Sequence, residues 1–384
     1  MNKCKFSEIA FVFFVGIILL GGFIYSLFMK ETISQLENRS AYKYKAMNLN
    51  NFLSKEFQNS IEDTLSDQLP FSMLIKEKYN YLSALYSKYM TNFVVSEKCD
   101  NRYFYYSNGC LAFGCNEYLV SKYDSSDVIF RINKINEIIS NSDVPVYLYY
   151  IERYDDINLE DNQKMGLFEK LKSNLKIEDN YISHFEIKSS EEYEKYFYKT
   201  DHHLNNVGAY KAYTEIANML GIKNIVKYSA ESCHKLKYSG SKARTYKVYD
   251  VFVEDFCIYD FDYPKHTTLV NGVNKEYGIS RIDDTVSPDY VKYAGFDSGE
   301  VVFDYYQPGR KNILILGNSY DNAYVKLLAT HFNKTYAVDI RHYKDEIGKE
   351  FNYLEYIEEK NIDIVLLNGD NGYFRNTIYD FEVK

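Results

Sequence analysis

The sequence has no excess of positive charge and no C-x-x-C motif. It contains 45 Lys and Arg against 54 Asp and Glu, which gives a net charge of −9. Because nucleic-acid binding requires a basic surface, this balance argues against nucleic acid as a partner. The six cysteines form no C-x-x-C pair, and the seven histidines are too scattered to complete a zinc site with them. We therefore expect neither a metal nor another cofactor.

The sequence also has no tryptophan, whereas tyrosine occurs 41 times. Exposed tyrosine rings can stack on sugars, which would suit a protein that binds a glycan. The other interpretation is a compositional bias that also raises the content of Lys, Asn and Ile, with most tyrosines packed inside the protein. We prefer the second interpretation.

Charge is missing altogether from residues 9–29 (IAFVFFVGIILLGGFIYSLFM), a run of 21 residues. As a helix, this run would be long enough to cross a bilayer core of about 30 Å. Lys3 and Lys5 precede it, which predicts a cytoplasmic tail over residues 1–8 and a main domain outside the cell membrane. The alternative is a cleaved signal peptide, but the run is longer than a usual signal core and no A-x-A-like site follows it. We expect a single-pass membrane anchor.

Residues 30–100 show helical periodicity. Leu53, Phe57, Ile61 and Leu65 recur every four residues and so share one helix face. We expect a helical stalk or an N-terminal cap in this region.

Residues 101–384 alternate between short apolar strands and amphipathic helices. Strands are predicted at 144–151, 313–316, 335–340 and 362–367, and helices at 209–220, 320–332 and 344–359. This alternation predicts an α/β domain with a parallel sheet flanked by helices. Residues 229–307 show little periodicity, and we expect short strands and long loops inserted into that domain.

Five cysteines lie beyond the predicted anchor, an odd number that rules out a complete set of disulfides. Cys110–Cys115 and Cys233–Cys257 are the first pairs to test.

Gly317-Asn318-Ser319 directly follows the strand ILIL and precedes a predicted helix. Ligands bind at the carboxyl ends of parallel strands, so a serine there sits on a sharp turn with its hydroxyl exposed. The adjacent helix N-terminus favours developing negative charge, which acyl transfer requires. The alternative is an ordinary strand-to-helix turn in which Ser319 caps the helix.

Thr200-Asp201-His202-His203-Leu204 lies directly before another predicted helix. A serine nucleophile needs a base, and the base needs a group that orients it. An Asp two residues before a His supplies both from one segment. Two other interpretations stay open: a metal site, although no further ligand pattern such as H-x-E-x-H is present, and a polar surface loop with a capping Asp.

The segment YKTDHHLNNVGAYKAY resembles the signature of the DHHW family of bacterial surface proteins, which is similar to alginate O-acetyltransferase proteins with SGNH-hydrolase-like domains. Further elements match in order and spacing: Glu37-Asn38-Arg39, residues 66–71 (SDQLPF), ILILGNSYDNAYVKLLATHF, and residues 338–343 (VDIRHY). The resemblance extends over about residues 37–384 and implies an SGNH-hydrolase-like α/β fold.

The resemblance implies a catalytic triad. Ser319 matches the nucleophile, His203 the general base and Asp201 the residue that orients it. His202 is the less expected base, because the family's pair has the spacing D-x-H. We therefore assign His202 to substrate binding.

The resemblance also implies that Asn318, Arg341 and Tyr343 contact the substrate. The alternative for Arg341 is a salt bridge at a strand end, and for Tyr343 a packed ring. Two residues depart from the family pattern: Leu204 replaces a tryptophan, and Asn318 replaces an aspartate. Both departures leave the predicted triad intact.

The resemblance implies O-acyl transfer, most simply O-acetyl transfer, to an extracellular polysaccharide. A multi-span membrane protein that delivers acetyl groups is the implied partner. Two alternatives share the same residues: a carbohydrate acetylesterase, and a non-catalytic protein of polysaccharide assembly or binding.

Overall fold

The computed structural model describes residues 3–28, 33–34, 39–40, 42–68, 72–95, 102–106, 109–121 and 128–383. Some predictions fall partly outside these residues. Residue 29 of the predicted anchor, residues 37–38 and 69–71 of two matched motifs, and the cysteine at 99 are not described. The chain divides into two compact units. The first comprises Met1–Ser96, Tyr106–Gly109 and Ala243–Val251, and the second Glu97–Tyr105, Cys110–Lys242 and Phe252–Lys384.

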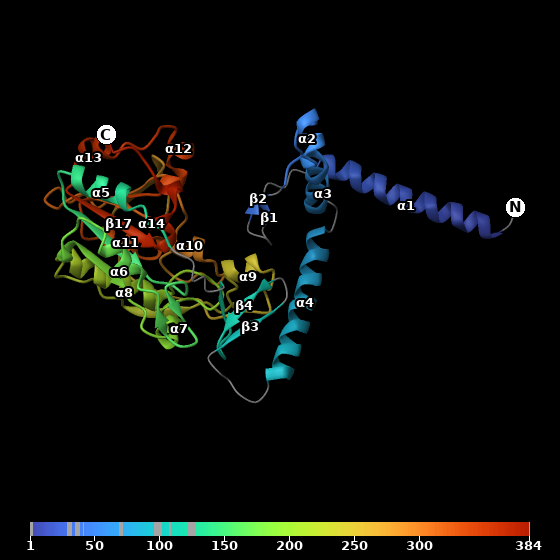
Figure 1. The fold of residues 1–384 in the computed structure, drawn as a ribbon, viewed down its shortest axis with the longest axis horizontal. Helices are drawn as coiled ribbons and strands as arrows, with labels where there is room; N and C mark the ends of the chain where they lie inside the picture. Colours follow the sequence, from blue (N-terminus) through green and yellow to red (C-terminus); the bar gives the residue numbers. More distant parts are fainter. Residues whose placement is uncertain are drawn as a thin grey trace. The chain divides into compact units, whose positions relative to one another are not determined.

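The first unit is mainly helical (Figure 1). Its elements are α1 (Lys3–Phe28), β1 (Ile33–Ser34), β2 (Arg39–Ser40), α2 (Leu49–Leu53), α3 (Glu56–Gln68) and α4 (Ser72–Val95). Helix α1 covers most of the predicted anchor. Within the described ranges, however, no helix combines the length and the apolar character needed to cross a membrane. The anchor over residues 9–29 stays a prediction.

An eight-stranded sheet forms the centre of the second unit (Figure 1), in the order β13-β12-β14-β16-β15-β17-β6-β9. Five neighbouring strands are parallel: β16 (Lys334–Val338), β15 (Ile313–Leu316), β17 (Ile364–Asp370), β6 (Val146–Ile151) and β9 (Ile182–Phe185). The other three pair antiparallel: β14 (Val301–Asp304), β12 (Thr267–Val270) and β13 (Val273–Asn274). The predicted α/β fold is thus confirmed, but residues 229–307 also contribute three strands to the main sheet.

Helices cover both faces of this sheet. Ile313 and Ile315 of β15 belong to one apolar cluster, and Leu314 and Leu316 to the other, because alternate side chains of a strand point to opposite faces. The first cluster includes residues of α7 (Ser190–Tyr196), α8 (Asn206–Met219) and α11 (Asn322–Ala329). The second includes residues of α5 (Ile132–Asn141), α6 (Leu167–Lys172), α12 (Ile340–Ile347), α13 (Tyr353–Lys360) and α14 (Asn371–Arg375). Burial on both sides explains why β15 is apolar at every position.

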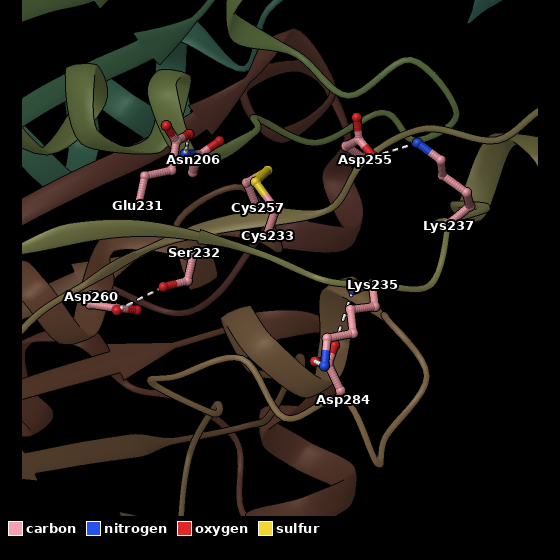
Figure 2. Close-up of a disulfide and its surroundings, with 10 residues drawn as sticks. All are labelled: Asn206, Glu231, Ser232, Cys233, Lys235, Lys237, Asp255, Cys257, Asp260 and Asp284. Atoms are coloured by element: carbon pink, nitrogen blue, oxygen red, sulfur yellow. Dashed lines mark hydrogen bonds and ion pairs between the residues drawn. A yellow bond between two sulfur atoms is a disulfide. The ribbon is translucent and has the colours of Figure 1, made fainter.

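The chain also contains smaller elements outside the main sheet. They are the antiparallel strands β3 (Tyr103–Tyr105), β4 (Leu111–Phe113) and β5 (Tyr118–Val120), the pair β7 (Ile157–Asn158) and β8 (Gln163–Lys164), and the short helices α9 (Ser241–Thr245) and α10 (Tyr290–Ala294). A hairpin of β10 (Ala230–Cys233) and β11 (Cys257–Asp260) is closed by a disulfide between Cys233 and Cys257 (Figure 2). This predicted pair is confirmed.

The predicted Cys110–Cys115 pair is wrong. Cys115 is disulfide-bonded, but Cys110 is a free thiol whose pKa is raised to about 12 by burial. The extended strand β4 lies between the two residues. A strand rises about 3.3 Å per residue, which holds the two Cα atoms farther apart than the roughly 7 Å that a disulfide can bridge.

Candidate active site

The turn after β15 presents Ser319. Helix α11 begins at Asn322 with Asp321 in the N-cap position, so the interpretation of Ser319 as the helix cap is wrong. A backbone hydrogen bond of 3.0 Å from Asp321 N–H to Asn318 O closes the turn. Gly317 has to be glycine here, since a Cβ would lie 2.0 Å from Asp321 Oδ2. The side chain of Ser319 is left half-buried at the carboxyl end of a central strand.

A short loop before α8 presents His203. Its ends are fixed by a bridge between Phe197 and Leu204 and by Asn205, whose side chain accepts a hydrogen bond from Gly208 N–H. Tyr198 N–H also donates to His203 O at 3.1 Å. The loop therefore holds its conformation through backbone contacts at both ends.

The two loops meet although 116 residues separate them in sequence. His203 Nε2 lies 2.9 Å from Ser319 Oγ, and His203 Nδ1 lies 2.7 Å from Asp201 Oδ1. With Nδ1 protonated and donating to the carboxylate, Nε2 is an acceptor for the serine hydroxyl. The three predicted triad residues are thus brought together in the arrangement of a nucleophile, a base and an orienting carboxylate.

The carboxylate of Asp201 is buried and fully hydrogen-bonded. Besides His203, Oδ1 accepts hydrogen bonds from Ser241 Oγ at 2.9 Å, and Oδ2 accepts from Tyr238 Oη at 2.5 Å and from Ser241 N–H at 2.7 Å. Burial by itself would raise the pKa of Asp201, but His203 and these donors hold it well below its ordinary value. The group is therefore an anion throughout the neutral range.

Tyr290 fixes the orientation of the imidazole from one side. Its ring stacks on His203 with centroids 3.9 Å apart and an interplanar angle of 3°. Its hydroxyl donates to Ser319 O at 3.0 Å. One side chain of α10 therefore contacts both the base and the turn that carries the serine.

His202 lies beside the triad without contacting the serine hydroxyl. Its Nδ1 lies 2.7 Å from Ser241 Oγ, and its ring centroid is 3.8 Å from that of His203. Burial, followed by the charge of His203, lowers the pKa of His202 to about 3, so this imidazole is neutral at physiological pH. The structure therefore places His203, and not His202, against Ser319.

The metal-site interpretation of the Asp-His-His segment fits the geometry less well. Donor atoms of Asp201, His202 and His203 do lie within 4.8 Å of one another. However, both ring nitrogens of His203 and both oxygens of Asp201 already have hydrogen-bond partners. A metal would have to displace these contacts.

Behind Ser319, Asn318 joins a buried charge network. Its amide donates to Asp370 Oδ1 at 2.9 Å, and Asp370 Oδ2 pairs with Arg153 Nη1 at 2.6 Å. The guanidinium also donates to Tyr320 Oη at 3.2 Å. Burial opposes ionisation of Asp370, but the charge of Arg153 keeps its pKa below the ordinary value. Asn318 therefore supports the turn, although the sequence predicts that it contacts substrate.

Arg341 forms salt bridges and Tyr343 is a packed ring, the alternatives to substrate binding that the sequence left open. Both lie on α12, and Arg341 is paired with Asp339 and Asp297, with Arg341 Nη2 at 2.8 Å from Asp297 Oδ2. Tyr343 is 2% exposed and packs against Phe351. A buried ring and a guanidinium neutralised by two carboxylates are structural contacts, so the predicted substrate role of both residues is not supported.

The sequence interpretation missed Glu254, which holds the segment before Asp201. Its carboxylate accepts hydrogen bonds from Lys199 N–H at 2.7 Å and from both N–H and Oγ1 of Thr200 at 2.6 Å. Burial raises the pKa of Glu254 to about 7, despite these hydrogen bonds. Glu254 comes from the aperiodic insertion, as do Tyr238 and Ser241, and no local pattern marks them.

The sequence interpretation also missed Arg153 and Asp370, which a rule already applied to Ser319 would have identified. Arg153 and Asp370 lie at the carboxyl ends of β6 and β17, the strand edge at which ligands bind in parallel sheets. The rule that identified Ser319 applies equally to these two positions.

Comparison of the sequence with protein-family models and with curated proteins finds no match. Among solved structures, a DHHW family protein from Eubacterium siraeum DSM 15702 aligns with a TM-score of 0.57 and 17% identity, over 72% of this chain and 97% of that protein. PatB1 of Bacillus cereus, solved with a sulfonyl adduct, aligns with a TM-score of 0.52 and 18% identity, over 71% of this chain and 98% of PatB1. A second PatB1 structure aligns with a TM-score of 0.50 and 18% identity, over 69% of this chain and 97% of PatB1. The structural neighbours thus include a DHHW family protein, as the sequence motifs predict, and the chain shares their fold.

Proposed function

We propose that this protein transfers O-acyl groups through a covalent intermediate on Ser319. The observation that carries the proposal is the continuous line of hydrogen bonds from Ser319 Oγ through His203 to the buried carboxylate of Asp201, with distances of 2.9 and 2.7 Å. A nucleophile, a base and a buried anion in this order have the geometry required for acyl transfer.

In the first step, Ser319 Oγ attacks the carbonyl carbon of an acyl ester while His203 Nε2 accepts the hydroxyl proton. Asp201 stabilises the imidazolium that forms, and the oxyanion needs a hydrogen-bond donor. Ser319 N–H has no hydrogen-bond partner within the described part of the chain, so it is free to supply one. The C–O bond of the donor ester then breaks, and His203 returns its proton to the departing alcohol.

In the second step, His203 removes a proton from an acceptor hydroxyl, which attacks the acyl-serine. The bond between the acyl carbon and Ser319 Oγ breaks, and His203 returns the proton to Ser319 Oγ. A sugar hydroxyl as acceptor makes the protein a transferase, and water makes it an esterase. We propose a hydroxyl of a surface polysaccharide and an acetyl group, as the motif resemblance implies.

We further propose that the reaction occurs outside the cytoplasm. The disulfides at Cys233–Cys257 and at Cys115 support an oxidising compartment, since disulfides persist there and are rare in the cytosol. A multi-span membrane protein that supplies acetyl groups remains the partner that the resemblance implies.

A sulfonyl fluoride tests the nucleophile directly, and PatB1 with its sulfonyl adduct guides the choice of reagent. We expect phenylmethylsulfonyl fluoride to add one sulfonyl group at Ser319, as located by peptide mass spectrometry. Ser319→Ala should abolish the adduct, and His203→Ala should slow its formation. If Ser319 of the folded protein stays unmodified, the protein is a non-catalytic relative.

Acetate release from p-nitrophenyl acetate then measures turnover, and added oligosaccharide separates the two acceptors. Acetyl transfer to the sugar at the expense of free acetate supports the transferase. Undiminished acetate release with no acetylated sugar identifies an esterase.

A further inference from the structure

A cavity lies next to the triad, and Tyr290 belongs to both sites. Besides stacking on His203, Tyr290 lines this cavity, as does Leu204, the residue after the base. The cavity has an empty volume of about 750 Å³ with its open mouth included.

Lys326 of α11 is the only charged residue among those that line the cavity. Its ammonium contacts only neutral groups: Ser280 Oγ at 2.9 Å, Tyr277 O at 3.5 Å and the ring of Tyr263 at 4.8 Å. It forms no salt bridge within the part of the chain that the structure describes. Burial lowers the pKa of Lys326, and the charge of Glu276 offsets only part of this shift. Such a cation is a ready partner for an anionic ligand.

The rest of the lining is rich in aromatic rings, and Tyr228, which is not part of the lining, packs against two of them. Tyr228, which is 42% exposed, stacks on Tyr259 with centroids 4.0 Å apart and an interplanar angle of 7°. Tyr210 contacts both rings and lines the cavity together with Tyr259. Exposed aromatic faces of this kind are suited to stacking on the apolar face of a sugar ring.

Part of the cavity lining comes from β11 of the disulfide-bonded hairpin. Cys257 lines the cavity, as does Asn206 of α8, whose amide donates to Glu231 of the hairpin at 2.7 Å. Figure 2 shows Asn206 and Glu231 beside the Cys233–Cys257 bond. The disulfide therefore ties β11, which lines the cavity, to the neighbouring strand β10.

We propose that this cavity binds an anionic sugar residue, with the acid group on Lys326 and the ring against the tyrosines. The inference rests on the proposed function in one respect, since it takes the ligand to be part of the glycan that reaches Ser319. It adds the substrate class: a polysaccharide that carries carboxylate or phosphate groups. The competing explanation is that Lys326 only clamps α11 to the loop at residues 277–280.

The test measures binding, so all variants carry Ser319→Ala and no turnover occurs. The probes for titration calorimetry with the full chain are trigalacturonate, its neutral methyl ester and mannose 6-phosphate. We expect at least one acid probe to bind, and the methyl ester to bind at least ten-fold more weakly than trigalacturonate if the carboxylate is the preferred acid. Lys326→Met should weaken the binding of the acid probe about ten-fold or more, the size expected for a charge-assisted hydrogen bond.

Ser280→Ala is the matched control, because it removes the strongest neutral contact of Lys326 and keeps the charge. It should lower the melting temperature slightly and leave acid binding within about three-fold, since only a neutral hydrogen bond is lost. Equal loss of binding in Lys326→Met and Ser280→Ala would identify a clamp and overturn the proposal. So would equal binding of acid and ester, or binding of no acid probe. Failure of the proposed function appears separately, as an unlabelled Ser319 in the parent protein.

Discussion

Replacing Asp201 by asparagine changes one oxygen of the triad carboxylate into an amide NH₂. At Oδ1, the new amide would face His203 Nδ1, the N–H groups of His202 and His203, and Ser241 Oγ. At Oδ2, it would face only Tyr238 Oη and Ser241 N–H. The amide nitrogen therefore takes the Oδ2 position, where the hydroxyl of Tyr238 can turn to accept but the N–H of Ser241 cannot.

This orientation of the asparagine amide sets the expected loss of stability and the expected loss of turnover. The N–H of Ser241 is left buried without an acceptor, which costs about 1–3 kcal/mol, and loss of the charge weakens the other contacts. We expect a decrease of about 2–4 kcal/mol in the free energy of unfolding. The oxygen still faces His203 Nδ1–H, so the correct tautomer is kept and only stabilisation of the imidazolium is lost. We expect turnover to fall about 10²–10³-fold, less than the roughly 10⁴-fold loss seen when asparagine imposes the wrong tautomer.

Two assays check this reasoning. Hydrolysis of p-nitrophenyl acetate gives turnover, with Ser319→Ala as the floor, and urea unfolding gives stability. Tyr238→Phe is the control, because it removes one donor and keeps the charge, and it should lower turnover no more than about three-fold. A folded Asp201→Asn protein with turnover within three-fold of wild type would refute an orienting role for this carboxylate.

The dependence of stability on acid pH is a second measurement on the same residue. Because the folded-state pKa of Asp201 is depressed, its contribution to stability is present above the ordinary pKa of about 4 and is lost as the pH falls below it. The stability of Asp201→Asn should accordingly change less than that of wild type over this acid range.

Three further predictions concern the insertion that surrounds the triad. Because the pKa of Glu254 is raised from 4.5 to about 7, its contribution should make the free energy of unfolding fall by about 3 kcal/mol as the pH rises through that interval. Urea titrations at several pH values should show that the stability of Glu254→Gln depends less on pH, and a pH dependence equal to that of wild type would contradict the assignment. Gly240→Ala should lower turnover and stability, because the new Cβ would lie 2.5 Å from the Cβ of Asp201. Gly309→Ala, whose Cβ would have nothing within 4 Å, should leave both unchanged, and equal effects of the two variants would show that the contact is unimportant. Replacing Cys233 and Cys257 by serine should lower the free energy of unfolding by about 3 kcal/mol, because the disulfide joins residues separated by 24 in sequence. A melting temperature equal to that of oxidised wild type would show that the hairpin forms without the bond.

The sequence alone determined the elements whose signals are local. Apolar strands followed by amphipathic helices predicted the α/β core, since each element carries its own periodicity. Ser319 was found because a strand-to-helix turn identifies a ligand-binding edge, and Asp201 with His203 because two residues of separation place both on one loop. Cys233–Cys257 was selected from spacing, and the structure confirms it.

Only the tertiary structure decided which side chains surround these motifs. Tyr238, Ser241 and Tyr290 contact the triad from an insertion without periodicity, and Glu254 of the same insertion holds the segment before it. Contacts across so many residues leave no local pattern. The unpaired state of Cys110 depends likewise on a strand that holds it away from Cys115.

The contacts of Arg341 and Tyr343 likewise depend on residues that are distant in the sequence. A motif shows that a residue type is present, but the choice between substrate and structure depends on neighbours brought in by folding. Asp297 neutralises the first residue and Phe351 covers the second, and neither contact is visible along the chain. Local pattern therefore predicted the candidate triad, and long-range packing determined which side chains surround it.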